Sequence, residues 1–183
     1  MTEFEKMLSQ QLYDFSDAEI CRSLAHARTL CARLQTVEPR SRACRVLLEE
    51  LIPNLPDTAV INPPFHCDHG CNIHLGEHVF FNTDCTVLDA GLVTIGSFTL
   101  FGPRCQIYTP QHPLDYRARR QSEEYAYPVT IGKNCWFGAG VIVCPGVTIG
   151  DNCVVAAGSV VVHSLPDNVL AAGNPATIRR VLD

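Results

Sequence analysis

One histidine of this chain stands where an imidazole could transfer a proton. His112 lies between Pro110 and Pro113. Proline fixes its own backbone and restricts the residue before it, so the chain around His112 has little freedom. Imidazole is the side chain best suited to general base or acid work near neutral pH. The alternative is a solvent-exposed loop histidine without a chemical role. The residues around His112 are therefore needed to distinguish a catalytic histidine from an exposed one.

A second group of reactive side chains is of metal-ligand type. Six of them fall close together: His66, Cys67, His69, Cys71, His74 and His78. Their Cys-x3-Cys and His-x3-His spacings do not match a zinc site, which needs a second pair of ligands at a set distance. Successive residues of a strand also point to opposite sides, so few of the six could converge. We predict no metal site here.

Both groups lie in or beside a six-residue repeat. From residue 128 to residue 162 a large apolar residue recurs every six positions, and a smaller one stands two positions before each. The large set is Ile131, Phe137, Val143, Ile149, Val155 and Val161, and the small set is Val129, Cys135, Val141, Val147, Cys153 and Ser159. This period fits neither an α-helix nor a hairpin strand. It predicts a solenoid in which each hexapeptide forms a strand and three hexapeptides complete a triangular coil.

The same period can be followed in earlier residues. It starts at Ile73 and Leu75, continues to Ile107 and returns at Val129, which makes about twelve hexapeptides or about four coils. Residues 108–128 interrupt the repeat and contain His112. Because a solenoid extrudes insertions from one face, often the functional one, we expect 108–128 to form a protruding catalytic loop.

The segments on either side of the repeat are expected to close its ends. Residues 1–57 are predicted to form a helical cap, with a break at 13–15 and a third helix that begins at Pro39 and ends before Pro53. Two capping-box pairs begin its first two helices: Thr2 with Glu5, and Ser16 with Glu19. The solenoid would cover 58–164, and 165–183 would close the last coil, all within one domain.

Composition limits the classes of partner. The chain of 183 residues has a formal net charge of −5 and 18% charged residues, which does not favour nucleic acid or an anionic membrane as a partner. No apolar run approaches the ~20 residues of a membrane span. The N-terminus lacks the basic and then apolar order of a signal peptide, so we expect a cytoplasmic protein.

The ten cysteines are predicted to be mostly reduced and structural. Four of them occupy the small inward position of the repeat, where a thiol serves as a compact apolar group: Cys85, Cys105, Cys135 and Cys153. At the other end of the chain, Gly173-Asn174-Pro175 predicts a tight bend beside Arg179 and Arg180. This segment is either an end cap or an anion site for phosphate groups.

Several motifs together resemble one known family. They are His66-Cys67-Asp68, Asn72-Ile73-His74-Leu75-Gly76, Phe81-Asn82, Leu88-Asp89, Gln111-His112-Pro113-Leu114, Trp136-Phe137-Gly138 and Ala171-Ala172-Gly173-Asn174-Pro175-Ala176. With them the chain resembles, over nearly its whole length, the maltose and galactoside O-acetyltransferases and the related nodulation acetyltransferases. The resemblance implies a mainly β protein, a left-handed parallel β-helix of hexapeptide repeats with a helical N-terminal cap. The handedness comes from the resemblance, since the period does not supply it.

The resemblance also implies an activity and a set of site residues. The activity is transfer of an acetyl group from acetyl-CoA to a hydroxyl of a sugar or similar small acceptor, in a homotrimer with active sites between subunits. His112 would be the general base, and Asn82 would lie near the reacting groups. The acceptor-side carboxylates would be Asp14, Asp68, Asp89 and Glu124. The cofactor side would include Trp136, Ala139, Ala157, His163, Asn174 and Arg180, with the Ala139 N–H facing the thioester oxygen.

The chain departs from the family pattern at three positions. Leu24 stands where the family usually has an arginine on the acceptor side, His163 where a lysine is common, and Thr177 where an arginine is common. The loss of a cation at Leu24 removes a bidentate partner for the acceptor, which leaves the identity of the acceptor open among sugars, amino sugars and other alcohols.

Two other functional classes are weighed against the acetyltransferase. One is a metalloenzyme similar to the γ-class carbonic anhydrases, suggested by the spacing of His69 and His74 but opposed by a third ligand that would fall among the helices. The other is a solenoid without catalytic activity that serves in assembly or binding. The joint presence of the loop histidine and the cofactor-side motifs favours the acetyltransferase.

Overall fold

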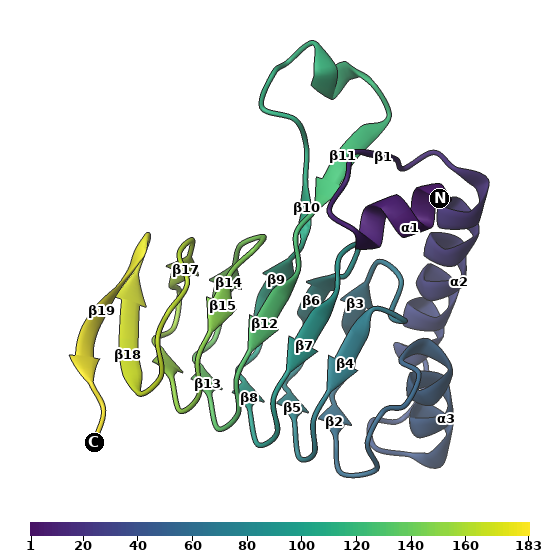
Figure 1. Ribbon diagram of the computed structural model, residues 1–183. Helices are drawn as coiled ribbons and strands as arrows, with labels where there is room; N and C mark the ends of the chain where they lie inside the picture. The colour runs from purple at the N-terminus through teal and green to yellow at the C-terminus, as the bar shows by residue number, and fades with distance from the viewer.

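The computed structural model describes all residues from 1 to 183, and its centre is a parallel β-helix with three walls (Figure 1). The first wall contains β2 (Val60–Ile61), β5 (Phe80–Phe81), β8 (Leu100–Phe101), β13 (Trp136–Phe137), β16 (Val154–Val155) and β18 (Val169–Gly173). The second contains β3 (Phe65–Cys67), β6 (Cys85–Leu88), β9 (Gln106–Tyr108), β14 (Ile142–Val143) and β17 (Val160–Val161). The third contains β4 (Ile73–Leu75), β7 (Val93–Ile95), β12 (Val129–Ile131) and β15 (Thr148–Ile149). The predicted fold class, a left-handed parallel β-helix with a helical cap, is confirmed.

The twelve expected hexapeptides all form strands of this solenoid, but the estimate of about four coils is too low. The irregular residues 60–72 already contribute β2 and β3, and β18 continues the first wall beyond the last hexapeptide. These strands lack the strict six-residue period, so a count of the period misses them. The first wall therefore has six successive parallel strands, because only β19 among its seven strands is antiparallel.

The inward residues are those that the repeat predicts. Every residue of both sets between Val129 and Val161 is buried. Residues in register stack on one another along the axis: the rings of Phe81 and Phe101 lie 4.4 Å apart, and those of Phe101 and Phe137 lie 4.7 Å apart, both nearly parallel. The four repeat cysteines are buried in the same core. Leu75 is the exception, since it is only partly buried.

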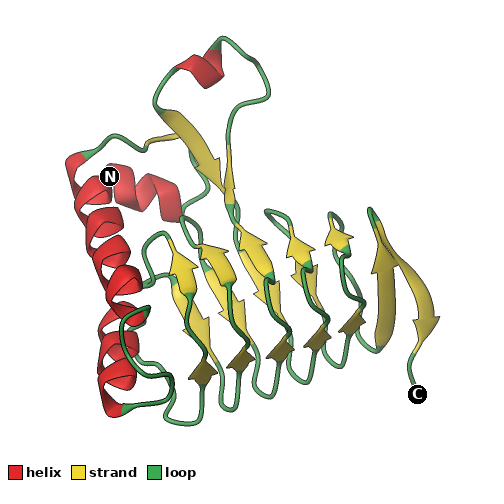
Figure 2. Ribbon diagram, turned by 180° about the vertical axis from the view of Figure 1, so that it is seen from behind, coloured by secondary structure: helices red, strands yellow, loops and turns green.

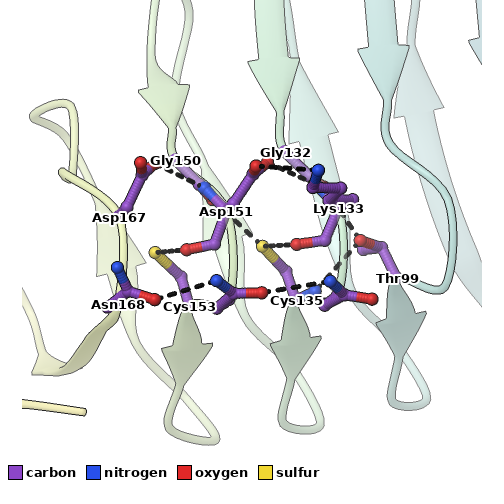
Figure 3. A network of polar contacts seen from close by, with 11 residues as sticks. Thr99, Gly132, Lys133, Cys135, Gly150, Asp151, Cys153, Asp167 and Asn168 are labelled. Atoms are coloured by element: carbon purple, nitrogen blue, oxygen red, sulfur yellow. Dashed lines mark hydrogen bonds and ion pairs between the residues drawn. The ribbon is translucent and has the colours of Figure 1, made fainter. Parts of the chain in front are cut away.

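The turns between walls are held by ladders that repeat with the coils (Figure 3). Asn134 donates to Asn152 at 3.1 Å, and Asn152 donates to Asn168 at 2.8 Å. All three asparagines have φ near +60° (57° to 58°), a region that asparagine tolerates better than most residues. Beside them a Cβ on Gly150 would lie 2.1 Å from Asp167 Oδ1, so glycine is required there by the close approach of the next coil.

The helical cap contains α1 (Glu3–Leu8), α2 (Ala18–Leu34) and α3 (Arg42–Leu51), and it covers the first coil (Figure 2). The predicted capping box of Thr2 and Glu5 is present. Two predicted helix starts are wrong. Asp17, not Ser16, caps α2, because its carboxylate accepts from the N–H groups of residues 19 and 20. Ser41, not Pro39, begins α3, because its hydroxyl accepts from Cys44 N. None of the helices is long and apolar enough to cross a membrane.

The insertion at 108–128 projects from the solenoid, as expected, but it has a sheet of its own (Figure 1). β10 (Pro110–Gln111) and β11 (Glu123–Ala126) are antiparallel, and a single 3₁₀ turn (Ala118–Arg120) lies at the tip. The break expected at 13–15 contains a strand, β1 (Tyr13–Asp14), which pairs with β11. The cap and the loop are thereby joined, and a cavity forms between them.

The C-terminal segment folds back as strand β19 (Ala176–Val181), antiparallel to β18. The bend predicted at Gly173-Asn174-Pro175 is present between the two strands. Arg180 lies opposite Leu170 in this hairpin. The hairpin closes the open end of the first wall.

Candidate active site

His112 lies at the root of the projecting loop, immediately after β10. Its Nε2 is 3.6 Å from Glu124 Oε2, and its ring meets Phe15 edge-on with the centroids 5.9 Å apart. The side chain is 53% exposed. The imidazole is therefore held on one side and open on the other, which is the condition for a base that must reach a bound substrate.

Glu124 is fixed by the strand pairing of cap and loop. It stands opposite Tyr13 in the β1–β11 pair, and the Tyr13 hydroxyl donates a hydrogen bond to its Oε1. Burial, with this hydrogen bond, raises the pKa of Tyr13 far above its ordinary value, so the phenol remains a donor. Glu124 is only 14% exposed and turns its second oxygen toward His112. It can stabilise positive charge on the imidazole when the base accepts a proton.

His112 separates two cavities. The first, of 350 Å³, lies between the helical cap, the first coils and the loop, and its lining includes Tyr13, Phe15, Leu24, Arg28, Asp68, His69, His112 and Glu124. The second, of 420 Å³, lies on the wall of β6 and β9, and its lining includes Thr86, Tyr108, His112, Glu124 and Pro145. The first cavity is small, partly apolar and rich in hydrogen-bonding groups, as expected for a small polar ligand.

Asp68 and Glu124 are the two predicted acceptor-side carboxylates that line the first cavity with His112. Burial, together with the charges of Asp89 and Glu124, raises the pKa of Asp68 to about 7. At neutral pH this carboxyl is thus present in both forms. It can donate or accept a hydrogen bond, and a hydroxyl can do the same.

The other two predicted acceptor-side carboxylates do not line the cavity. Asp89 is fully buried, and its oxygens accept from the N–H groups of Asp68 and His69 at 3.0 and 2.8 Å and of Asn72 at 3.2 Å. Burial raises its pKa to about 6. Asp14 turns toward Ser16 and accepts hydrogen bonds from its backbone N–H at 2.8 Å and from its hydroxyl at 2.6 Å. In this geometry Asp89 holds the turn that presents Asp68, and Asp14 holds the chain between α1 and α2.

Replacement of Asp68 by asparagine should raise stability in a pH-dependent way. The pKa of Asp68 is about 7 in the fold against an ordinary 3.8, so its contribution to stability is complete below pH ~4 and is lost as pH rises through ~7. Asp68→Asn stays neutral. Its melting temperature should therefore match that of the wild type at pH ~4 and exceed it by a margin that grows up to pH ~7, measured by thermal denaturation. A difference independent of pH would contradict this assignment.

The structure places Asn82, Ala139 and Ala157 together along another edge of the solenoid. Phe81, Phe101, Phe137 and Val155 are in register on the first wall, and the residues after them turn toward the second wall. There the coils approach closely, since a Cβ on Gly138 would lie 2.5 Å from Ala157 N. His112 leaves the opposite edge of the second wall, after β9. Within one chain the predicted base and Asn82 are thus not brought together.

The remaining cofactor-side residues are exposed on the later coils. Trp136 lies on the first wall and is 57% exposed, and Arg180 is on the same wall, separated from it by β16 and β18. His163 follows β17, and Asn174 lies in the β18–β19 bend. None of these residues lines either cavity at His112. In the single chain they form a set apart from the two cavities at His112.

No three His, Cys, Asp or Glu side chains lie close enough together to hold a metal ion. Of the six metal-ligand residues between 66 and 78, His69 lines the cavity at His112, and His78 stacks on Phe98 with the ring centroids 4.7 Å apart. All ten cysteines are free thiols in the structure.

Comparison with known proteins identifies the family. The maltose acetyltransferase hexapeptide capping motif matches residues 6–56, and the hexapeptide repeat of succinyl-transferase matches residues 128–162. Nodulation protein L of Rhizobium meliloti (strain 1021) is 42% identical over 179 residues, which are 97% of this chain and 98% of that protein. The chain belongs to the hexapeptide-repeat sugar O-acetyltransferases.

Solved structures of the sugar O-acetyltransferase family agree with this assignment. The maltose O-acetyltransferase of Clostridium difficile 630 superposes with a TM-score of 0.97 at 38% identity, covering 100% of this chain and 98% of that one. A hexapeptide-repeat acetyltransferase of Vibrio cholerae O1 biovar eltor, complexed with acetyl coenzyme A, superposes with a TM-score of 0.92 at 38% identity, covering 100% of both chains. A galactoside acetyltransferase in complex with coenzyme A superposes with a TM-score of 0.95 at 32% identity, covering 100% of this chain and 92% of that one. This chain is accordingly an acetyltransferase that uses acetyl-CoA as co-substrate.

Three residues that line the 350 Å³ cavity are not predicted as site residues from the sequence: Tyr13, Arg28 and His69. Tyr13 was assigned only to a break between helices, and His69 only to the rejected metal group. Arg28 lies one helical turn after Leu24 and lines the same cavity. The spacing of four residues on α2 could have indicated Arg28, whereas Tyr13 and His69 are placed by contacts between distant parts of the chain.

Proposed function

We propose that this acetyltransferase moves the acetyl group of acetyl-CoA to a hydroxyl of a sugar or a similar small polyhydroxylated acceptor. The observation that carries the proposal is the position of His112, whose imidazole borders a cavity lined by Asp68 and Glu124. Carboxylates accept hydrogen bonds from the hydroxyls of such a ligand. The maltose and galactoside acetyltransferases among the relatives support a sugar as acceptor.

In the proposed mechanism His112 acts as general base in a direct attack. It takes the proton of the acceptor hydroxyl while that oxygen attacks the thioester carbonyl carbon. The tetrahedral intermediate then collapses with cleavage of the C–S bond, and the imidazolium returns the proton to the leaving thiolate of CoA. An unactivated alcohol is a weak nucleophile near neutral pH, and a positioned base is worth ~10²–10⁴-fold. Glu124, at 3.6 Å, stabilises the imidazolium between these steps.

The developing charge on the thioester oxygen needs a donor, and we assign it to the backbone N–H of Ala139. This N–H donates no hydrogen bond within the chain, so it is available to a ligand. Loss of one such donor from an oxyanion hole typically costs ~10²–10³-fold in turnover. Asn82, on the same edge, would lie beside the acetyl group.

We propose a homotrimer, and the separation of these two groups supports an active site shared between subunits. His112 and its carboxylates lie at one edge of the second wall, whereas Asn82, Ala139 and Ala157 lie at the other. The site would be completed when the His112 edge of one subunit faces the Asn82 edge of its partner. Trp136, His163, Asn174 and Arg180 would then border the cofactor, with Arg180 supplying positive charge for its phosphates. We place the enzyme in the cytoplasm, where acetyl-CoA is available.

An acceptor screen tests the proposal. Purified protein is incubated with acetyl-CoA and with maltose, glucose, isopropyl thiogalactoside or glucosamine, and release of free thiol is measured. Simple primary amines are included as competing nucleophiles. Thiol release that depends on a sugar supports the proposal, with the product's ester linkage established by mass spectrometry and base lability. Release with amines alone would reassign the enzyme to N-acetylation.

Coenzyme A should stabilise the protein measurably. A ligand that binds only the folded state at 100 times its Kd contributes ~2.7 kcal/mol, which for a domain of this size corresponds to several degrees in melting temperature. The measurement is a thermal shift across a CoA concentration series, with dephospho-CoA and adenosine as controls. A melting temperature that does not respond to CoA would favour the alternative of a solenoid without catalytic activity.

A further inference from the structure

The acceptor cavity contains a second imidazole, that of His69, to which the mechanism gives no role. His69 is 4% exposed and lies in the turn between β3 and β4. Its backbone N–H donates to Asp89 Oδ1 at 2.8 Å, and Asp89 also accepts from Asp68 N and Asn72 N. The backbone of His69 is therefore fixed to the same buried carboxylate as that of Asp68.

The ring of His69 is oriented by the helical cap. Its Nδ1 lies 2.8 Å from the hydroxyl of Ser23 on α2. Its ring also makes an edge-to-face contact with Phe4 of α1, with the ring centroids 5.6 Å apart and an angle of 79° between the ring planes. A hydrogen bond on one nitrogen and an aromatic contact together define how the other nitrogen points. The cap thus sets the direction of Nε2.

Nε2 is left without a partner in the chain but is not sealed from solvent. Every side-chain nitrogen or oxygen that is fully buried has a hydrogen-bond partner, and no hydrogen bond of His69 Nε2 is present. This atom must therefore reach an accessible surface. The residue lines the 350 Å³ cavity that also contains Asp68, His112 and Glu124, so that cavity is the surface within its reach.

From this geometry we infer that His69 Nε2 binds a second hydroxyl of the acceptor, distant from the hydroxyl that reacts, and that Ser23 is the residue that positions the ring. The inference rests on the proposed transfer to a sugar. Burial lowers the pKa of His69 to about 4, so the ring is neutral at physiological pH and carries one donor and one acceptor nitrogen. The Ser23 hydroxyl can complement either tautomer. A neutral hydrogen-bonding group suits an uncharged hydroxyl and does not duplicate the base at His112.

Two amide substitutions separate recognition from a structural role. Gln can place a polar atom near the position of Nε2, whereas Asn can place one near Nδ1, and Phe keeps the ring but removes both nitrogens. KM for the best of the four sugars of the screen and KM for acetyl-CoA are measured for His69→Phe, His69→Gln, His69→Asn and Ser23→Ala.

We expect His69→Phe to raise the sugar KM about 5- to 10-fold, the effect of one lost hydrogen bond, with kcat and the acetyl-CoA KM within about 2-fold of wild type. His69→Gln should recover most of this loss, and His69→Asn should not. Ser23→Ala should raise the sugar KM by a smaller factor. Monodeoxy analogues of the same sugar, each lacking one hydroxyl, are compared with the parent sugar. For one of them the KM of the wild type should be higher than for the parent sugar, whereas the KM of His69→Phe should be the same for both.

Several results would overturn the inference. They are an unchanged sugar KM in His69→Phe, recovery by His69→Asn instead of His69→Gln, or equal changes in both KM values. If His69→Phe fails to fold, the comparison of His69→Gln with His69→Asn decides the matter by the same criteria. If wild type releases no thiol with any of the four sugars, the proposed function itself fails. If wild type is active and the variants behave like it, only the role of His69 fails.

Discussion

Replacement of His112 by alanine should lower the rate of acetyl transfer by at least ~10²-fold while the protein remains folded. The loss is expected because the acceptor hydroxyl would lose the imidazole positioned to take its proton. Folding should be preserved because the side chain is 53% exposed and its contacts are with Phe15 and Glu124 at the cavity edge. The measurement is kcat/KM for the sugar and acetyl-CoA, with circular dichroism and the melting temperature on the same sample.

A matched control for this variant is available on α2. His26 is also exposed, at 58%, its Nε2 lies 3.6 Å from Glu50 Oε1, and it lines neither of the two cavities at His112. His26→Ala should therefore retain wild-type turnover. Near-normal turnover by His112→Ala would exclude His112 as the base. Equal losses in both variants would show that the effect is not specific to the active site.

Replacement of Val143 by aspartate should prevent folding. Val143 is 1% exposed and lies in register with Ile107 and Val161 along the second wall. A carboxyl group there would be surrounded by stacked apolar residues of adjacent coils. Burial without a partner costs several kcal/mol, a large part of the ~5–15 kcal/mol that stabilises a typical domain. The expected result is insoluble protein or loss of the thermal transition.

Thr148→Asp provides the comparison, since it introduces the same side chain at a strand position whose residue is exposed. This variant should be expressed, fold and melt close to the wild type. If Val143→Asp were soluble and active, the inward set of the repeat would have been assigned wrongly. A failure of Thr148→Asp alone would indicate that this outer face is covered by another subunit.

The solenoid could be predicted from the sequence because its periodicity follows local geometry. An inward side chain at each large position, as at Phe137 or Val155, is required in every coil, so one short stretch repeats the rule many times. The first coil was harder, since Phe65 and Cys67 face inward without the strict six-residue spacing. The predicted helix starts differ from the observed ones by one or two residues, because two competing start signals stand close together in each case: Ser16 beside Asp17, and Pro39 two residues before Ser41.

The cavity could be predicted only in part, because it depends on contacts between distant residues. Glu124 meets Tyr13, which is 111 positions earlier, and His69 meets Ser23, which is 46 positions earlier. No spacing rule connects such pairs. The family motif gave Asp68 and Asp89 the same role, whereas burial separates them: one carboxyl lines the cavity and the other holds the backbone beneath it.

The antiparallel β19 has a consequence for how copies of this protein can associate. A parallel stack that ended on β18 would offer its unpaired backbone to the first coil of another molecule, and repetition of that contact would give fibres. The returning strand reverses the direction of the edge, shifts its register by a bulge near Leu170 and places Arg179 and Arg180 along it. With α2 and α3 over the opposite end, the first wall offers no parallel edge for polymerisation along the axis. Closed rings can form instead through the sides of the prism.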